Sequence, residues 1–219
     1  MKYLLIFLVT QCFSQKQYTF DYIIEYENII IQDTLRKMGS TYVLTNSKDN
    51  TYFGMLNERD SLNFSLDFMD YKSIRTNYSI IKKSDFADAE IISLNCKDII
   101  KNTHPFQHLT KKYHFTLPKD TIINTKVYLT YTIEDNNIKR KKDKKNNAIT
   151  YIVDKETDFH LPVFTDEAAY EEYHAEGKIP NGIIFEKINC NFLNKLVHIQ
   201  RRVNYLPTNK KIVIPLDCK

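Results

Sequence analysis

The chain has 219 residues, of which 42% are hydrophobic and 13% aromatic, and its formal net charge is +4. This length fits one domain or at most two small ones, and the apolar content excludes a disordered or fibrous chain. The charge is concentrated in the run Lys139–Lys145, which alone carries +5, and this excludes a nucleic-acid-binding face spread over the molecule.

The N-terminal residues 1–14 have the pattern of a cleavable secretory signal peptide. Lys2 supplies a positive charge, Tyr3–Val9 is an unbroken apolar run, and the small residue Ser14 precedes polar sequence. The run is too short for a permanent membrane-spanning helix, which needs about 20 residues. We therefore predict export to the periplasm, the outer membrane or the medium, with a mature chain that begins at Gln15.

Apolar and polar residues alternate with a period of two in Phe20–Tyr26, Leu62–Phe68 and Val127–Ile133. This alternation predicts strands with one face on a core and the other in water. Further strands are predicted at Thr41–Leu44, Thr51–Leu56, Tyr113–Leu117, Ala148–Val153, Ile183–Ile188, Leu196–Tyr205 and Lys211–Ile214. Polar turns such as Asn46–Asn50 and Asn57–Asp60 join them, so the sheet is expected to be antiparallel.

One helix is clear, over residues 166–176. Asp166 is a good N-terminal cap, and Gly177 is a good residue to end the helix. A second helix is predicted more weakly, at Asp85–Asp88 or Lys97–Lys101. The fold class is therefore mainly β, a β-rich α+β fold. We expect a strongly curved antiparallel sheet or incomplete barrel over residues 15–219, as a single domain, with one short helix packed near its C-terminal half.

Cleavage of the signal peptide would leave three cysteines, Cys96, Cys190 and Cys218. In an oxidising compartment these residues allow one disulfide and one remaining thiol. A disulfide at the penultimate residue would hold the C-terminus in place, so the pair Cys96 and Cys218 is favoured, and Cys190 with Cys218 is the alternative. Lipid attachment at Cys12 is a further alternative for the N-terminus.

Aromatic side chains gather on two of the alternating segments. Curved antiparallel sheets often hold apolar or lipid-like ligands in their mouths. The residues predicted to line such a site are Phe20, Tyr22, Tyr26, Phe64 and Phe68. The alternative is that these side chains form the core, because a chain of this size must bury its aromatic residues.

The basic run between two predicted strands is expected to be a protruding hairpin loop. It can contact anionic lipid headgroups, polysaccharide or an acidic envelope partner. The residues predicted to make this contact are Lys139, Arg140, Lys141, Lys142, Lys144 and Lys145. The alternative is a solvated tip that prevents the sheet edge from pairing with other chains.

No catalytic motif stands out. The sequence lacks Gly-x-Ser-x-Gly, and its four glycines form no phosphate-binding loop. His104 and His108 have the spacing of one helix face, but Pro105 between them disfavours a helix, so we predict no metal and no cofactor. Asp158 and His160 can pair for acid–base chemistry. Without a nucleophile in view, the simpler interpretation is a surface pair.

Several segments resemble a family of uncharacterised exported β-rich proteins of flavobacteria, which implies the same compartment and a single β-rich domain. The segments are Leu44–Ser47, Phe159–Phe164, Ala168–Tyr173, Ile179–Ile183 and Lys210–Pro215 with Cys218. More loosely, the strand ending at Glu25–Glu27 is similar to exported GLPGLI-type proteins, although the GLPGLI stretch is missing. A curved sheet with one helix is also similar to periplasmic lipoprotein carriers.

These patterns favour a non-enzymatic envelope or periplasmic protein that binds an apolar or lipid-like ligand or an envelope partner. One alternative is an exported hydrolase with its site near Asp158 and His160. Another is a structural or interaction module without a pocket, in which the sheet edge or the basic loop makes the contact.

Overall fold

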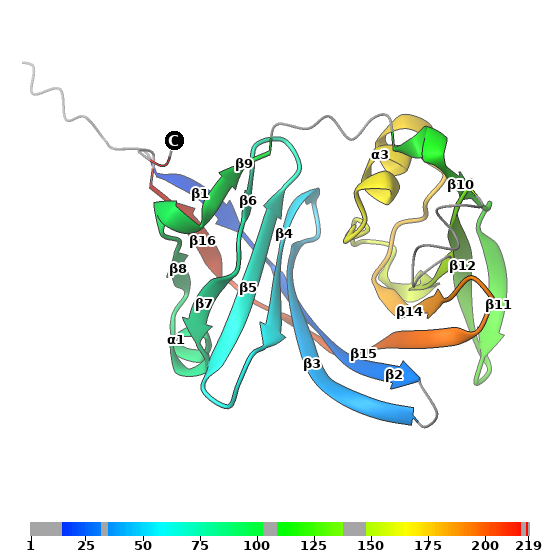
Figure 1. The fold of residues 1–219 in the computed structure, drawn as a ribbon, viewed down its shortest axis with the longest axis horizontal. Coiled ribbons are helices and arrows are strands. Elements are labelled where there is room, and N and C mark those ends of the chain that lie inside the picture. Colours follow the sequence, from blue (N-terminus) through cyan, green and yellow to red (C-terminus); the bar gives the residue numbers. More distant parts are fainter. Residues whose placement is uncertain (1–14, 32–34, 103–108, 138–147, 216–217, 219) are drawn as a thin grey trace, which may run out of the picture.

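The structure, a computed structural model, describes residues 15–31, 35–102, 109–137, 148–215 and 218 (Figure 1). Thirteen strands form one large sheet, in which every pair of neighbours is antiparallel. In spatial order its main path is β10 (Tyr113–Phe115), β12 (Lys126–Asp135), β13 (Ala148–Asp154), β14 (Ile184–Cys190), β15 (Leu196–Pro207), β2 (Tyr22–Ile31), β3 (Leu35–Asn46), β4 (Asp49–Glu58), β5 (Asn63–Asp70), β6 (Ile74–Thr76) and β9 (Ile99–Lys101).

Two short strands pair beside this path, β11 (Lys119–Ile123) with β12 and β7 (Ser79–Lys82) with β5. The sheet is strongly curved, and its two terminal strands, β9 and β10, do not pair with each other within the described residues, so it stays open (Figure 1). The predicted fold class, a mainly β and strongly curved antiparallel sheet, is confirmed.

The helix α3 (Glu167–Glu176) lies inside the curve of the sheet (Figure 1). The carboxylate of Asp166 accepts hydrogen bonds from the amides of Ala168 and Ala169, at 2.9 and 3.3 Å, and so caps the helix. Gly177, with φ of +63°, ends the helix in the left-handed region. The sequence prediction of this helix is therefore confirmed, including both of its ends.

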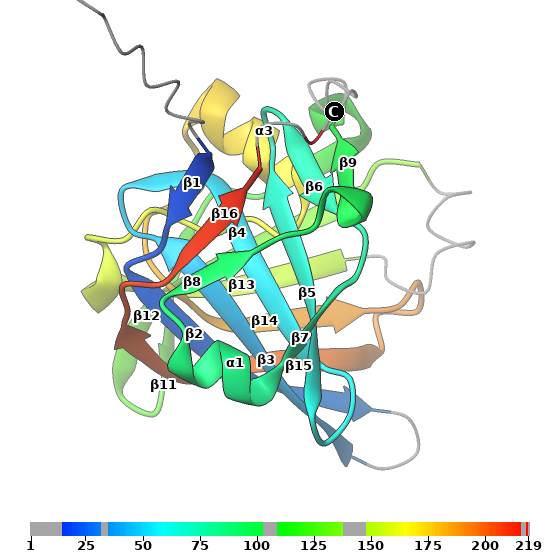
Figure 2. The same ribbon diagram turned by 90° about the vertical axis from the view of Figure 1, so that its left-hand side faces the viewer.

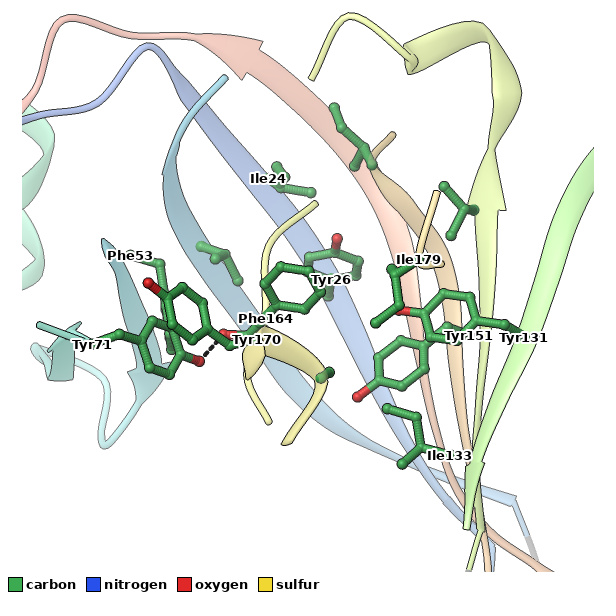
Figure 3. Close-up of a cluster of buried hydrophobic side chains, with 14 residues drawn as sticks. Ile24, Tyr26, Phe53, Tyr71, Tyr131, Ile133, Tyr151, Phe164, Tyr170 and Ile179 are labelled. Atoms are coloured by element: carbon green, nitrogen blue, oxygen red, sulfur yellow. Dashed lines mark hydrogen bonds between the residues drawn. The ribbon is translucent and has the colours of Figure 1, made fainter. Parts of the chain in front are cut away.

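Side chains from α3 and from the loop before it fill the concave face. Tyr71, which directly follows β5, and Tyr170 of the helix stack with ring centroids 3.9 Å apart, and the Tyr71 hydroxyl donates to the backbone oxygen of Phe164 over 2.7 Å (Figure 3). Tyr131 and Tyr151 stack farther along the sheet at 4.9 Å. These side chains belong to one inner core, which lies between the helix and the sheet.

A second, three-stranded sheet covers the convex face of β2 to β5 (Figure 2). It holds β1 (Lys16–Thr19), β16 (Lys211–Ile214) and β8 (Ile91–Ser93), and the helix α1 (Lys83–Asp88) lies beside it. Strands β16 and β8 are parallel, which the sequence analysis did not anticipate. The outer core between the two sheets includes Phe20, Leu44, Leu56, Phe86 and Ile212.

This second layer corrects the expectation that each alternating strand has one face in water. On β5, Phe64, Leu66 and Phe68 point to the outer core, whereas Met69 packs against the inner core. The centre of the sheet is thus covered on both sides. Alternation shows only that the two faces of a strand differ in polarity, and it does not show that one of them is in water. The second layer was also missed because its short strands, β1 and β8, were not recognised in the sequence.

The two segments that were predicted more weakly as a second helix have different outcomes. Residues Asp85–Asp88 belong to α1, as predicted. The segment Lys97–Lys101 is divided between the 3-10 turn η1 (Cys96–Asp98) and β9, so a helix there was wrong. Two further 3-10 turns are η3 (Thr110–Lys112) and η4 (Lys155–Thr157).

A disulfide joins Cys96 to Cys218, with the two Cα atoms 4.7 Å apart. The favoured pairing is therefore confirmed, and Cys190 keeps its thiol. Since Cys96 begins η1, the bond ties the C-terminal end of the chain to the edge of the sheet that carries β9. Within the described residues no helix is both long and apolar enough to cross a membrane.

Candidate ligand site on the concave face

A cavity on the concave face has a volume of about 350 Å³. It lies between strands β4, β5, β6 and β9 and the residue Thr165, which precedes α3. We call it the concave-face cavity. Its apolar lining is formed by Phe53, Met55, Phe68, Met69, Tyr78 and Ile100, and its polar lining by Asp67, Arg75, Thr76, Asn77 and Thr165.

The antiparallel register of β4 and β5 builds the floor of this cavity. Phe53 pairs with Met69, and Met55 pairs with Asp67, so that all four side chains point to the concave side. Two methionines at the floor provide polarizable side chains with several rotatable bonds, which adapt to ligands of irregular shape.

The rim is formed by the link between β6 and β7. Tyr78 has φ of +54° and is 70% exposed. A left-handed backbone is unfavourable for an aromatic residue and marks a strained position. The amide of Asn77 donates to the backbone oxygen of Asp98 over 2.7 Å, and the Ser79 hydroxyl donates to the Asp98 carboxylate over 3.3 Å. Asp98 lies in η1, so the disulfide at Cys96 also supports this rim.

Two charged groups face the cavity. Burial raises the pKa of Asp67, and a weak hydrogen bond from the Asn57 amide, at 3.4 Å, opposes that rise. Arg75 is exposed at the mouth. Burial raises the pKa of Glu167, and the nearby positive charge of Arg75 opposes this rise. The mouth therefore holds a guanidinium, and the floor holds a carboxyl group that is protonated more readily than usual.

Deeper under the loop before α3 there is a second void of about 20 Å³, lined in part by Tyr26, Val43 and Lys187. The Lys187 ammonium group donates to the Thr165 hydroxyl over 2.8 Å. Burial lowers the pKa of Lys187, and the negative charge of Asp166 opposes this shift. A void of this size has room for about one water molecule. This void is therefore too small for a larger ligand.

The structure divides the five aromatic residues predicted to form a ligand site. Phe20, Phe64 and Phe68 belong to the outer core, and Tyr26 belongs to the inner core. Tyr22 contacts the rings of Phe159, His160 and Tyr205. Of the five, Phe68 alone borders the concave-face cavity.

Sequence reasoning missed most of the lining of the concave-face cavity. Asp67 occupies a strand position that the alternation assigned to solvent, whereas Met55 lies on a predicted strand without assigned faces and Met69 lies just beyond a predicted strand. Arg75, Tyr78 and Ile100 lie on short edge strands or links that were not predicted. A usable signal was Met69, which continues the alternation on the face of Asp67, because an apolar residue on a face assigned to water indicates that something covers that face.

His160 does not belong to a catalytic cleft. Its side chain is 0% exposed, and its Nε2 lies 2.9 Å from the hydroxyl of Thr45, which is also buried. Asp158 is exposed, so the two residues do not form a surface pair. Asp158 and His160 would share one side of a strand, but they lie in the irregular segment after η4. The hydrolase alternative required an accessible imidazole with a serine or cysteine partner, which the geometry around His160 does not provide.

Three sequence predictions concern residues outside the described ranges. These are the signal peptide at residues 1–14, the pair His104 and His108, and the basic run at Lys139–Lys145. The basic run lies in the segment that joins β12 to β13, between the paired residues Glu134 and Ala148. Within the described residues no group of three or more potential ligands is arranged to hold a metal ion.

No protein-family model matches the chain, and no curated protein matches it. The solved structures with partial similarity include MucB of Pseudomonas aeruginosa in complex with MucA, at 7% identity and a TM-score of 0.41, covering 86% of this chain and 53% of that one. A DUF1329 family protein from Desulfovibrio piger gives 8% identity and a TM-score of 0.35, with 86% of each chain covered.

A putative outer membrane lipoprotein-sorting protein domain from Vibrio parahaemolyticus gives 10% identity and a TM-score of 0.31, with 85% of each chain covered. This chain spans about half the length of the MucB chains that it matches. All three similarities have TM-scores below 0.5, and they identify neither a family nor a ligand. Membership in the flavobacterial family stays a prediction.

Proposed function

We propose that the protein is an exported, non-enzymatic binding protein that holds the apolar part of an amphipathic, lipid-like ligand in the concave-face cavity. The observation that carries this proposal is a cavity of about 350 Å³ whose floor is formed by Phe53, Met55 and Met69 and whose edge is formed by Ile100. Ligand sites commonly have volumes of about 300–1,000 Å³, with apolar walls and a few polar groups.

The polar groups at the mouth fit the head of such a ligand. Arg75, Asn77 and Thr165 are exposed there, and a guanidinium binds carboxylate or phosphate oxygens in a bidentate manner. Asp67 at the floor repels an anionic ligand when it is ionised. Because burial raises the pKa of Asp67, we expect an anionic amphipath to bind more tightly as the pH falls through that pKa.

Export is supported by two independent features. The disulfide between Cys96 and Cys218 is of the kind that persists in oxidising compartments, and residues 1–14 have the pattern of a signal peptide. N-terminal sequencing of the protein secreted by a bacterial host tests the second feature. We expect the sequence to begin at Gln15, and an intact Met1 would contradict it.

The ligand proposal is tested with the fluorescent fatty acid cis-parinaric acid, titrated into the chain from Gln15 to Lys219 below the concentration at which the probe forms micelles. We expect saturable binding of one probe per chain. The variant Asn77→Trp, which adds a large side chain at the exposed mouth, should abolish binding. Ile100→Asn, which makes the cavity edge polar, should weaken binding about tenfold or more, the loss expected for one buried aliphatic side chain.

The matched control is Ile80→Asn. Ile80 and Ile100 are both exposed isoleucines on short edge strands, at 56% and 40%, but Ile80 does not line the cavity. The control should bind the probe as the unchanged chain does. Equal binding by all four proteins, or no binding by the unchanged chain, would contradict the proposal and favour the interaction module without a ligand.

A further inference from the structure

Two hairpins of the main sheet end side by side. Strands β2 and β15 are neighbours, with Ile30 opposite His198, so the end of hairpin β2–β3 lies beside the turn of hairpin β14–β15 (Figure 2). We call this region the hairpin end and define it by Arg36, Lys37, Met38, Leu193, Lys195 and Leu196. Residues 32–34, which include Asp33, lie outside the described ranges.

The turn of hairpin β14–β15 exposes the apolar side chain of Leu193 to water. The side-chain oxygen of Asn191 accepts hydrogen bonds from the amides of Leu193 and Lys195, at 2.9 and 3.0 Å, and the Asn191 amide donates to the backbone oxygen of Lys195 over 2.8 Å. Asn194 takes the left-handed backbone that this turn needs, with φ of +56°. The ordered turn leaves Leu193 67% exposed, and Met38 on the neighbouring hairpin is 52% exposed.

An apolar groove continues from this turn along the convex face of the sheet. It has a volume of about 390 Å³, and Ile29, Ile31, Leu196 and Ile199 form most of its wall. Ile29 and Ile31 lie on the same face of β2 as Ile23, which packs on the outer core, but the second sheet does not extend over them. The hairpin end therefore joins exposed apolar side chains to an uncovered apolar groove.

The charges around this apolar surface are mainly positive. Among the described residues, Lys37 and Lys195 lie beside it, and Glu27 pairs with Lys37 over 2.7 Å. Arg36, which pairs with Ile30, lies at the same end of the sheet on its other face. Arg36 and Lys195 form no ion pair within the described part of the chain. Two such ends facing each other would repel, which disfavours a second copy of this chain as the occupant. An anionic surface with an apolar interior complements both properties.

We infer that the hairpin end docks onto the surface of an anionic lipid bilayer. Leu193 and Met38 enter the boundary between headgroups and acyl chains, and the neighbouring cations contact the headgroups. A single insertion of a few side chains gives weak, reversible binding that depends on both apolar contact and charge. This inference does not depend on a ligand in the concave-face cavity, and it uses none of the residues of that cavity.

The test is co-sedimentation of the chain from Gln15 to Lys219 with two kinds of vesicle, phosphatidylcholine alone and phosphatidylcholine mixed with phosphatidylglycerol. All described elements lie within this chain. We expect binding to the mixed vesicles that weakens as salt is added. Leu193→Asp should weaken it about tenfold or more, the loss expected for one buried aliphatic side chain. Arg36→Gln with Lys195→Gln should weaken it about fivefold for each cation removed.

The matched controls change the same kinds of residue elsewhere. Ile122 is 72% exposed on β11, whose turn lies at the opposite end of the strands from the hairpin end (Figure 2), so Ile122→Asp should leave binding unchanged. Lys82→Gln with Lys97→Gln removes two exposed cations that lie outside the hairpin end. The basic run Lys139–Lys145 stays intact in every variant, so any loss is due to the hairpin end alone.

Circular dichroism and thermal unfolding confirm that each variant is folded. The inference is overturned if Leu193→Asp binds the mixed vesicles as the unchanged chain does, if the Ile122 control loses as much binding, or if the two vesicle types bind equally. It is also overturned if the unchanged chain is a dimer that Leu193→Asp dissociates, because a second copy would then cover this surface.

Discussion

The Nε2 atom of His160 lies 2.9 Å from the Thr45 hydroxyl, and the Nδ1 atom of the same ring contacts the backbone oxygen of Leu161. Both ring nitrogens are thus used inside the protein. The contact joins the segment before α3 to strand β3, which is 115 positions away in the chain. His160 therefore helps to position the segment before α3 against β3.

Burial lowers the pKa of His160, and this shift makes folding depend on pH. The unfolded chain takes up a proton near the ordinary histidine pKa of about 6.5 while the folded chain does not. The free energy of unfolding should therefore be highest above this pH and fall as the pH drops toward the folded-state pKa. Urea unfolding between about pH 8 and pH 5 should show a shallower fall for His160→Gln. His114→Gln, at an exposed position of β10, is the control, and an unchanged slope for His160→Gln would contradict the assignment.

The strained backbone of Tyr78 predicts opposite effects on stability and binding. Tyr78→Asn places a residue that tolerates the left-handed region at φ of +54°. We expect a free energy of unfolding that is higher by up to about 1 kcal/mol, together with weaker binding of cis-parinaric acid. Chemical denaturation and probe titration measure the two effects. Lower stability with unchanged binding would show that the strain has no role in the rim.

The disulfide is expected to be the largest single contribution of the C-terminal end to stability. It joins residues 122 positions apart, and removing such a constraint costs about 5 kcal/mol through the entropy of the unfolded chain. Cys96→Ser with Cys218→Ser should lower the free energy of unfolding by this amount and remove its sensitivity to reductant. Cys190→Ser should change neither property. The unreduced protein should react with one maleimide per chain, and two or more labels would contradict the observed pairing.

The cap of α3 predicts a smaller effect. The Asp166 carboxylate accepts two amide hydrogen bonds at the start of the helix, so Asp166→Ala should lower the free energy of unfolding by about 1 kcal/mol. Asp166→Asn keeps an acceptor at the same position and should restore most of the loss. Equal destabilisation by both variants would mean that charge, and not the cap, is the cause.

The basic run Lys139–Lys145 stays a prediction from sequence. Each basic residue near an anionic membrane contributes about 1 kcal/mol, so replacing all six by glutamine should weaken binding to phosphatidylglycerol-containing vesicles by more than about 100-fold. The free energy of unfolding should not change. If vesicle binding is unchanged, the run is a solvated tip that keeps the sheet edge from pairing.

Local chemistry made the longer strands and the helix α3 predictable. The strand period, the turn at Asn46–Asn50 and the two ends of the helix after Asp166 depend on neighbours in the chain, and the structure contains each of them. The pairing of Cys96 with Cys218 was also favoured from the sequence, because a disulfide at the penultimate residue holds the C-terminus in place. Composition and period therefore determined the mainly β class and the curved antiparallel sheet.

The location of the site depended on the tertiary structure. Alternation separates Phe64 and Phe68 from Asp67 and Met69 on β5, but it does not tell which set faces the ligand side when both faces are covered. Strands β1, β16 and β8 come from distant parts of the chain and cover the convex face, so the aromatic side became core and the mixed side became the cavity. Which side of β5 faces the cavity therefore depends on burial by distant segments of the chain, and no local sequence pattern contains that information.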